Sequence, residues 1–250
     1  MLIRKTIALL ILASVMPWST GSAQDSAAID PMADQVLRQM SEYLSGLPHF
    51  RVEALVSEDV EIESGQLVVT GLNLDMVVRR PDRLWVDLSG DDGHRRLQYD
   101  GETVRLIDYT MGTVARAPAQ EDIQTTVEYL IDNLGIVVPL AELAFDDPYA
   151  AGIANVETAT YLGTRLVEGV EHHHLALTQE TIDWEIWIAN TGRPLPRKLL
   201  IRYKQEAGSP QFTAIISQWD LSSGAPDALF SAEAPVGFNR INFIETGGER

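Results

Sequence analysis

The stretch LNLDMVVRRPDRLWVDL, residues 72–88, shows how most of this chain folds. In its first half, apolar residues occupy every second position, and a period of two is typical of a β-strand with one buried face. RLWVDL at 83–88 predicts a second strand close behind the first. The apolar positions of the first run are Leu72, Leu74, Met76 and Val78. We expect neighbouring antiparallel strands that share one apolar face.

The same alternation recurs on both sides of this stretch. Upstream, Phe50, Val52 and Ala54 alternate with other residues, and Ser64-Gly65 predicts a turn between the two runs. Downstream, Asp100-Gly101 predicts a hairpin between strands at 96–100 and 102–109. Further strands are expected at 161–166, 170–177, 182–188, 199–203 and 212–219.

Three segments have helical periodicity instead. Asp30 can cap a first helix that starts at Pro31, and Gly46 lies near its end. A second helix ends at Gly135, and a short third one is expected over about residues 139–145. The apolar positions of the first two are Met32, Val36, Met40, Tyr43, Leu44, Leu47, Ile123, Val127, Leu130, Ile131 and Leu134.

These elements predict an α+β fold in which helices cover a large curved antiparallel sheet of about nine or ten strands. That geometry can enclose a cavity. No linker, repeat or low-complexity tract divides the chain after about residue 30, so we expect a single domain over 30–245. Flexible segments are expected at 24–29 and 246–250.

The N-terminus predicts export. Arg4 and Lys5 precede an apolar stretch and a run of small residues that ends at Ala23, as in a secretory signal peptide. The strongly apolar part, residues 7–15, is much shorter than the roughly 20 residues that a membrane-spanning helix needs. We therefore expect cleavage after Ala23, removal of residues 1–23, and a soluble protein in the periplasm.

Charge and cysteine content exclude several classes of function. The chain has no cysteine, which excludes disulfides, thiolate metal sites, a cysteine nucleophile and a lipidated N-terminal cysteine. Without residues 1–23 it carries 17 basic and 36 acidic side chains. Because such a surface repels phosphate, we expect no nucleic-acid partner, no adsorption to anionic lipid and no stable membrane insertion.

Catalytic motifs are absent from the sequence. There is no nucleophile elbow, zinc-protease motif, phosphate-binding loop or dinucleotide fingerprint, so we expect neither an enzyme nor a cofactor. His172 and His174 are the best candidates for a metal because alternate strand residues point to the same side. Asp183 or Glu185 could supply a third ligand, but two imidazoles alone do not make a zinc site. No catalytic or metal-binding residue is assigned.

Several segments carry a family resemblance. They are RRPDRLWVDL at 79–88, YDGETVRLID at 99–108, DPYA at 147–150, HHLAL at 173–177, DWEIWI at 183–188 and RPLPRKLLIRYK at 193–204. Through them the chain resembles, from about Asp30 to Phe243, the predicted periplasmic proteins of domain-of-unknown-function family 2092. That family is similar to the outer-membrane lipoprotein carrier superfamily. The resemblance implies a half-open antiparallel barrel with helices as a lid over an apolar cavity.

A carrier or chaperone for an apolar ligand is the leading functional hypothesis. The ligand would be a lipid, an acyl chain or a lipoprotein, held between the sheet and the helices. The residues expected to line its cavity are Leu74, Met76, Val78, Leu84, Val86, Ile182, Trp184, Ile186, Leu199, Ile201 and Tyr203. One alternative is an envelope interaction module with a protein partner and a filled interior. A second is a metal-assisted hydrolase that uses His172 and His174.

Overall fold

The computed structural model describes residues 28–222 and 224–243. Its strands form one sheet in the order β1-β8-β9-β10-β11-β12-β2-β3-β4-β5-β6-β7-β13. Neighbouring strands are antiparallel throughout, except that the short outermost strands β1 and β13 pair in parallel with β8 and β7. The predicted large antiparallel sheet is therefore confirmed.

The strands of the first half are β1 (Ala28–Ile29), β2 (His49–Glu61), β3 (Leu67–Arg79), β4 (Arg83–Gly90), β5 (Gly93–Tyr99), β6 (Thr103–Asp108) and β7 (Thr113–Pro118). Those of the second half are β8 (Thr158–Val167), β9 (Val170–Thr178), β10 (Ile182–Ala189), β11 (Pro196–Tyr203), β12 (Gln211–Asp220) and β13 (Asn239–Ile241). The helices are α1 (Pro31–Ser45), α2 (Ile123–Leu134), α3 (Pro148–Ile153), α4 (Asp227–Ser231) and the 3₁₀ helix η1 (Ala141–Ala144).

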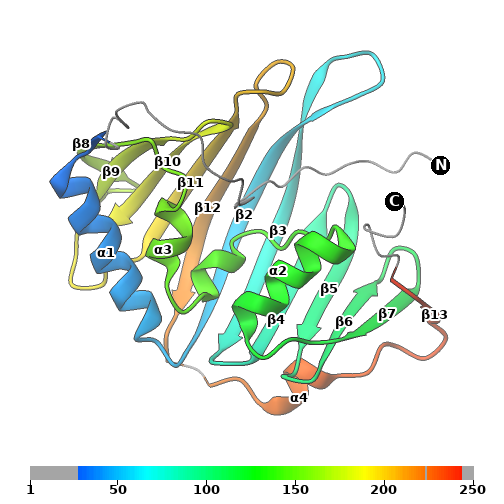
Figure 1. The fold of residues 1–250 in the computed structure, drawn as a ribbon. Helices are drawn as coiled ribbons and strands as arrows, with labels where there is room; N and C mark the ends of the chain where they lie inside the picture. Colours follow the sequence, from blue (N-terminus) through cyan, green and yellow to red (C-terminus); the bar gives the residue numbers. More distant parts are fainter. Residues whose placement is uncertain (1–27, 223, 244–250) are drawn as a thin grey trace, which may run out of the picture.

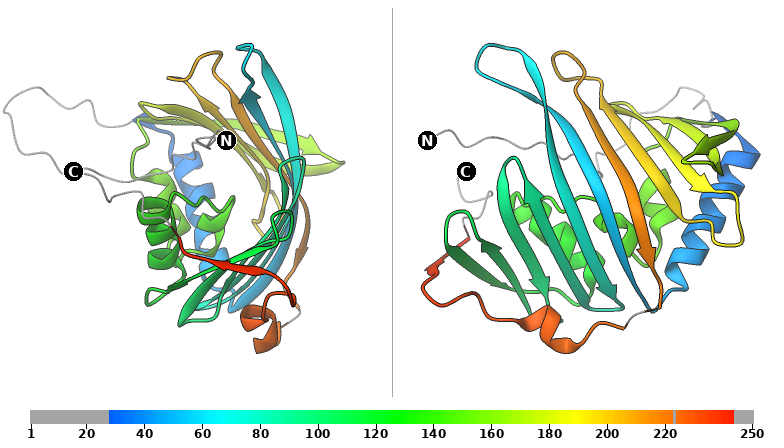
Figure 2. Two further views of the ribbon diagram at one scale, coloured as in Figure 1. Left: turned by 90° about the vertical axis from the view of Figure 1, so that its right-hand side faces the viewer. Right: turned by 180° about the vertical axis from the view of Figure 1, so that it is seen from behind.

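The sheet curves around its helices. Figure 1 shows α1, α2 and α3 on one face, and the side view in Figure 2 shows that this face is concave. Helix α4 packs on the opposite, convex face, where Phe230 is buried with Val77 and Trp85. The other helices and η1 thus form a cover over the concave face, as the sequence predicted.

The centre of the sheet is the β2–β3 hairpin, whose strands pair without interruption from His49–Arg79 to Glu61–Leu67. Every second residue over 50–56 and 72–78 is apolar and faces the concave side, where Val52, Met76 and Val78 are fully buried. Their burial removes apolar surface from water and contributes about 1.5–3 kcal/mol for each large side chain. The period of two in the sequence therefore identified the inner face of these strands.

Helices α1 and α2 have the predicted caps Asp30 and Gly135, and α2 also has an N-terminal capping box that was not predicted. The Asp30 side chain accepts a hydrogen bond from the Met32 backbone nitrogen at 2.7 Å, and Asp122 forms a capping box with Thr125 at the start of α2. Gly135 ends α2 with a φ of 64°, a left-handed conformation that favours glycine. One assignment was wrong: Met32 is 43% exposed, because the buried stripe of α1 runs through other positions. That stripe consists of Ala33, Val36, Leu37, Met40 and Leu44.

Short elements account for most differences from the prediction. The helix expected over 139–145 is a single 3₁₀ turn over Ala141–Ala144, and α3 was missed. Asp147 is the N-cap of α3 and accepts from the Ala150 backbone nitrogen at 2.9 Å. Strand β7, helix α4 and strands β1 and β13 were also missed. Elements of two to six residues are too short to show a period.

Both chain ends extend beyond the described residues. The predicted signal peptide at 1–23, its cleavage site and the tail at 246–250 all lie outside them. Of the segment 24–29, Ala28 and Ile29 lie in β1, where they pair with Thr158 and Ala159. Within the described ranges, none of the helices is long and apolar enough to cross a membrane.

Candidate functional site: an apolar cavity under the helical cover

A cavity of about 400 Å³ lies between the concave face of the sheet and the segment that joins α2 to η1. The sheet contributes Leu72, Val86, Leu97, Leu106, Ile201 and Phe212 to its wall. The cover contributes Ile131, Ile136, Val137, Val138, Pro139 and Leu140. Almost all of these side chains are aliphatic, so the wall is suited to an apolar guest rather than to a charged or sugar-like one.

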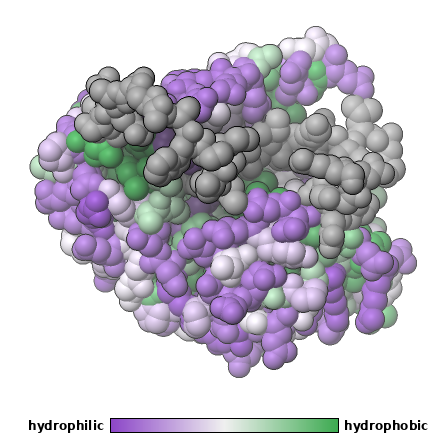
Figure 3. Space-filling model, in the orientation of Figure 1, coloured by the Kyte–Doolittle hydropathy of each residue, from purple (hydrophilic) through white to green (hydrophobic). Residues whose placement is uncertain are grey.

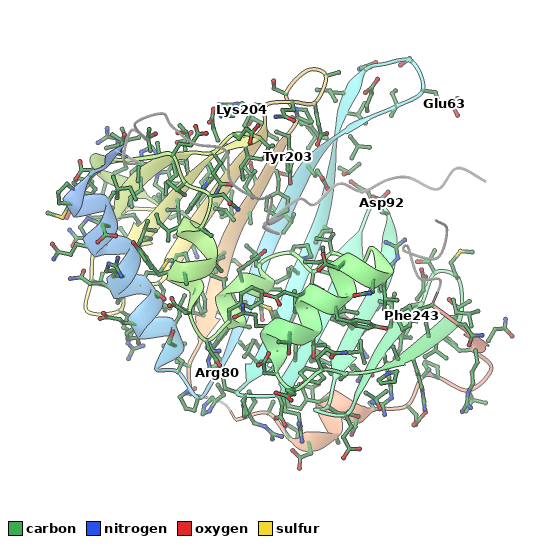
Figure 4. The ribbon with its side chains drawn as sticks, in the orientation of Figure 1. Glu63, Arg80, Asp92, Tyr203, Lys204 and Phe243 are labelled. Atoms are coloured by element: carbon green, nitrogen blue, oxygen red, sulfur yellow. The ribbon has the colours of Figure 1, made fainter. Side chains whose placement is uncertain are left out.

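The cavity lies toward one end of the central strands. Leu72 on β3 lines it, whereas Leu74, Met76 and Val78 on the same face pack under α2 and η1 in the main core. All four residues follow the same alternation along β3, but different parts of the chain lie above them. Figure 4 places Tyr203 and Asp92 toward the cavity end of the sheet and Arg80 at the opposite end.

Arg80 fixes the closed end of the cover. Its buried guanidinium donates to the backbone oxygens of Leu47 at 3.2 Å, Leu44 at 3.4 Å and Leu143 at 3.5 Å, and also to that of Ala144. These contacts join the end of β3 to the end of α1 and to η1. Burial lowers the pKa of Arg80, and Asp146, which lies 3.2 Å from it, partly offsets this effect.

The cover over the cavity itself is irregular backbone. Residues 135–140 have the sequence GIVVPL, and both Gly135 and Leu140 have positive φ angles, of 64° and 62°. The segment is attached to α2 through the Ile136 backbone nitrogen, which donates to the Leu130 backbone oxygen at 2.9 Å. Val138 and Leu140 are buried against the sheet, so the segment is held mainly by apolar packing.

Three carboxylates interrupt the apolar wall, and one of them is Asp92 in the turn between β4 and β5. Glu58 of β2 and Glu142 of η1 both line the cavity, together with Tyr203. Burial raises the pKa of Glu58, and the nearby charges of Asp92, Glu206 and Asp59 add to the increase. Burial also raises the pKa of Glu142, and it raises the pKa of Tyr203 together with the charges of Glu58, Glu206 and Glu142.

The predicted cavity residues fall into three groups. Val86, Leu199, Ile201 and Tyr203 line the cavity. Leu74, Met76, Val78 and Leu84 fill the core beneath α2 and η1. Ile182 packs against Ile201 and Tyr203, Ile186 packs in the second core cluster with α1, and Trp184 contacts both clusters. The structure therefore does not bring the last two groups to the cavity wall, because the second group lies beneath α2 and η1 and the third packs against other core side chains.

Sequence reasoning missed the cover segment over 135–140 and the wall residues Glu58 and Glu142. The apolar run over 136–140 was recognisable, but it has no period, and part of it was assigned to a helix. Glu58 continues the inward alternation of Ala54 and Val56 on β2. An acidic residue at an inward position was the signal that could have identified it.

The histidines of β9 do not form a metal centre. His172 Nδ1 lies 2.9 Å from the Val170 backbone oxygen, and His174 Nε2 lies 2.7 Å from Glu185 Oε2. His174 also stacks on Trp187, with ring centroids 4.2 Å apart. In the part of the chain that the structure describes, no three histidine or acidic side chains converge as metal ligands. The geometry gives no support to the hydrolase hypothesis.

The surface of the cover is more polar than the wall beneath it. Figure 3 views the molecule from the side of the helices, and much of the described surface there is hydrophilic, with hydrophobic patches between polar residues. The apolar character of the site is thus a property of the interior.

Comparisons with known proteins agree with this fold. A family model described as "Predicted periplasmic protein (DUF2092)" matches residues 33–244. The structure of an uncharacterised conserved protein from Thermus thermophilus is similar, with 12% identity, a TM-score of 0.51, and coverage of 84% of this chain and 99% of that one. No curated protein matches the chain.

Two further solved structures match with lower scores. Lipoprotein LppX from Mycobacterium tuberculosis has 15% identity and a TM-score of 0.47, over 78% of this chain and 98% of its own. A LolA superfamily protein from Nitrosomonas europaea has 9% identity and a TM-score of 0.42, over 79% and 96%. At these identities the likeness concerns the fold.

Proposed function

This chain belongs to the DUF2092 family of predicted periplasmic proteins, and from that premise we propose that it is a carrier or chaperone for an apolar ligand. The ligand would be a lipid, an acyl chain or the acyl part of a lipoprotein, held between the sheet and the cover. The observation that carries the proposal is the cavity of about 400 Å³ with an aliphatic wall. Ligand pockets in proteins typically measure about 300–1,000 Å³.

The expected affinity suits a carrier. Burial of about a dozen methylenes at about 0.8 kcal/mol each contributes roughly 10 kcal/mol. The loss of translational, rotational and side-chain freedom offsets part of this, which leaves binding in the micromolar range. A ligand held at that strength can be released to an acceptor without an energy-consuming step in the carrier.

The cavity also separates this proposal from the interaction-module hypothesis. That hypothesis predicts no bound ligand and is favoured by an interior filled with the protein's own side chains. The space beneath residues 135–140 is instead open, so an apolar ligand is the better-supported occupant. The absence of catalytic motifs in the sequence favours a binding protein over an enzyme.

Mass spectrometry and a cavity-filling variant test the proposal. Native mass spectra of protein purified from the periplasm should show a bound acyl species, and a neutral fluorescent apolar probe should bind to the delipidated protein. L72W should abolish probe binding, because the indole fills the part of the cavity lined by Leu72 and its cross-strand neighbour Gly90. The control L55W adds the same side chain at a position on the neighbouring strand that is 53% exposed, and it should bind normally. Wild-type protein that is always ligand-free and binds no probe would refute the proposal.

A further inference from the structure

Glu58 and Glu142, two of the three carboxylates in the cavity wall, have no basic partner among the described residues. Glu58 has no hydrogen bond or ion pair from its side chain to any residue of 28–222 or 224–243, and no basic group contributes to its pKa. The Glu142 carboxylate accepts only from its own backbone N–H within the same ranges. Both groups nevertheless face an aliphatic cavity. Both residues are half-buried, and a carboxylate that loses part of its hydration is usually paired, because desolvation of an unpaired charge is costly.

The charges around them are mostly of the same sign. Arg95 is the single basic residue among the described side chains that line the cavity, and it is already bonded to Asp108 Oδ2 at 3.1 Å and to the Asp92 backbone oxygen at 3.5 Å. Nearby Lys204 is paired with Asp183 at 2.9 Å. Three acidic side chains, Glu58, Asp92 and Glu142, thus share the cavity wall with one basic side chain.

An apolar cavity with more acidic than basic side chains in its wall discriminates between head groups. A carboxylate or phosphate head would add a like charge to a desolvated site, whereas an ammonium group would supply the missing partner of Glu58 and Glu142. Charge-assisted hydrogen bonds of this kind are about twice as strong as neutral ones. Tyr203, which lies close to both carboxylates, provides a further polar group at the same place.

We propose that the cavity selects amphiphiles whose polar head carries an amine, with the ammonium group at the acidic side chains of the wall, Glu58 and Glu142 among them, and the alkyl chain against the aliphatic part. This inference rests on the proposed function and adds the chemical class of the ligand. The burial that raises the pKa of both glutamates is consistent with it, because an incoming cation stabilises their charged forms.

Three probes of equal chain length test the inference. Binding of dodecylamine, dodecanol and dodecanoate to the delipidated full chain is measured at pH 7.5, below their micellar concentrations, by displacement of the neutral fluorescent probe. Dodecylamine should bind about tenfold or more tightly than dodecanol, and dodecanoate more weakly than both. The double variant E58Q/E142Q should lose this amine preference while its affinity for dodecanol stays the same.

Glu63 provides a matched control. It is exposed on the β2–β3 turn, which projects away from the cavity in Figure 4, so E63Q changes net charge without changing the wall. E63Q should keep the full amine preference. Equal binding of dodecylamine and dodecanol, tighter binding of dodecanoate, or an equal effect of E63Q would overturn the inference and leave the carrier proposal standing. Failure of all three probes to bind would refute both.

Discussion

At the scale of single residues, Leu72 and Leu74 show what the sequence could and could not predict. Both are apolar, lie two positions apart on β3 and face the concave side, yet one lines the cavity and the other lies in the core. Alternation identifies the face of a strand. It contains no information on where a helix distant in the sequence ends above that strand. The inner face was therefore predictable, whereas the position of the cavity along it was not.

The raised pKa of Glu142 predicts how the stability of the protein depends on pH. Burial raises its pKa in the folded state above the ordinary value, so folding favours the protonated form, and the charged form destabilises the protein at neutral and higher pH. E142Q should therefore increase the free energy of unfolding at pH 8 by about 1 kcal/mol or more. The gain should shrink as the pH falls toward 4.5, the ordinary pKa of a glutamate side chain.

Urea unfolding of E142Q and wild type at pH 4.5, 6 and 8 measures this difference. E63Q is the control, since it removes an exposed carboxylate and should show little change at any of these pH values. A constant difference between E142Q and wild type across the range would contradict the assignment of the effect to the charge of Glu142.

At the scale of elements, sequence reasoning worked where an element was long enough to show a period and had clear ends. Helix α1 starts after Asp30, and α2 ends at Gly135, as their capping residues predicted. It failed for α3 and η1, which have six and four residues. These short helices depend on tertiary contacts, such as the hydrogen bond from Ser41 Oγ to Asp147 at 3.2 Å, which local sequence cannot show.

The end of α2 offers an element-scale prediction. Gly135 has a φ of 64°, where a β-carbon is strained, so G135A should lower the free energy of unfolding by about 1 kcal/mol. Thermal unfolding followed by circular dichroism measures the loss. G192A is the control: nothing lies within 4 Å of the added carbon, and Gly192 has no positive φ, so stability should hardly change. Equal losses in the two variants would show that the conformation of Gly135 is not the cause.

At the scale of the whole molecule, the two faces of the sheet have different roles. The concave face holds the main core, the helical cover and the cavity, whereas the convex face carries a separate small cluster beneath α4. Arg79 reinforces that cluster by donating to the Ala225 backbone oxygen at 3.0 Å. The general architecture was predictable from counting strands and helices. The packing of α4 was not, because its five residues have no recognisable pattern.

A variant in the convex cluster tests whether the faces are independent. Phe230 is fully buried, so F230A should lower the free energy of unfolding by about 3 kcal/mol. The affinity of the cavity for the neutral probe should remain that of the wild type at temperatures where the variant is folded. Chemical denaturation and probe titration on the same sample measure both quantities. A parallel loss of affinity would show that the convex cluster supports the cavity.

The contacts of Arg80 also have a consequence for the size of the guest. The Arg80 guanidinium links the helical cover to the end of β3, and core side chains fill the space between it and Leu72. The cavity is therefore closed on that side. A hydrocarbon tail that enters from the opposite side can therefore extend only as far as these core side chains. Tails beyond a limiting number of carbons would keep their surplus methylenes in water and gain nothing from them, so the molecule would discriminate among homologous chains by length.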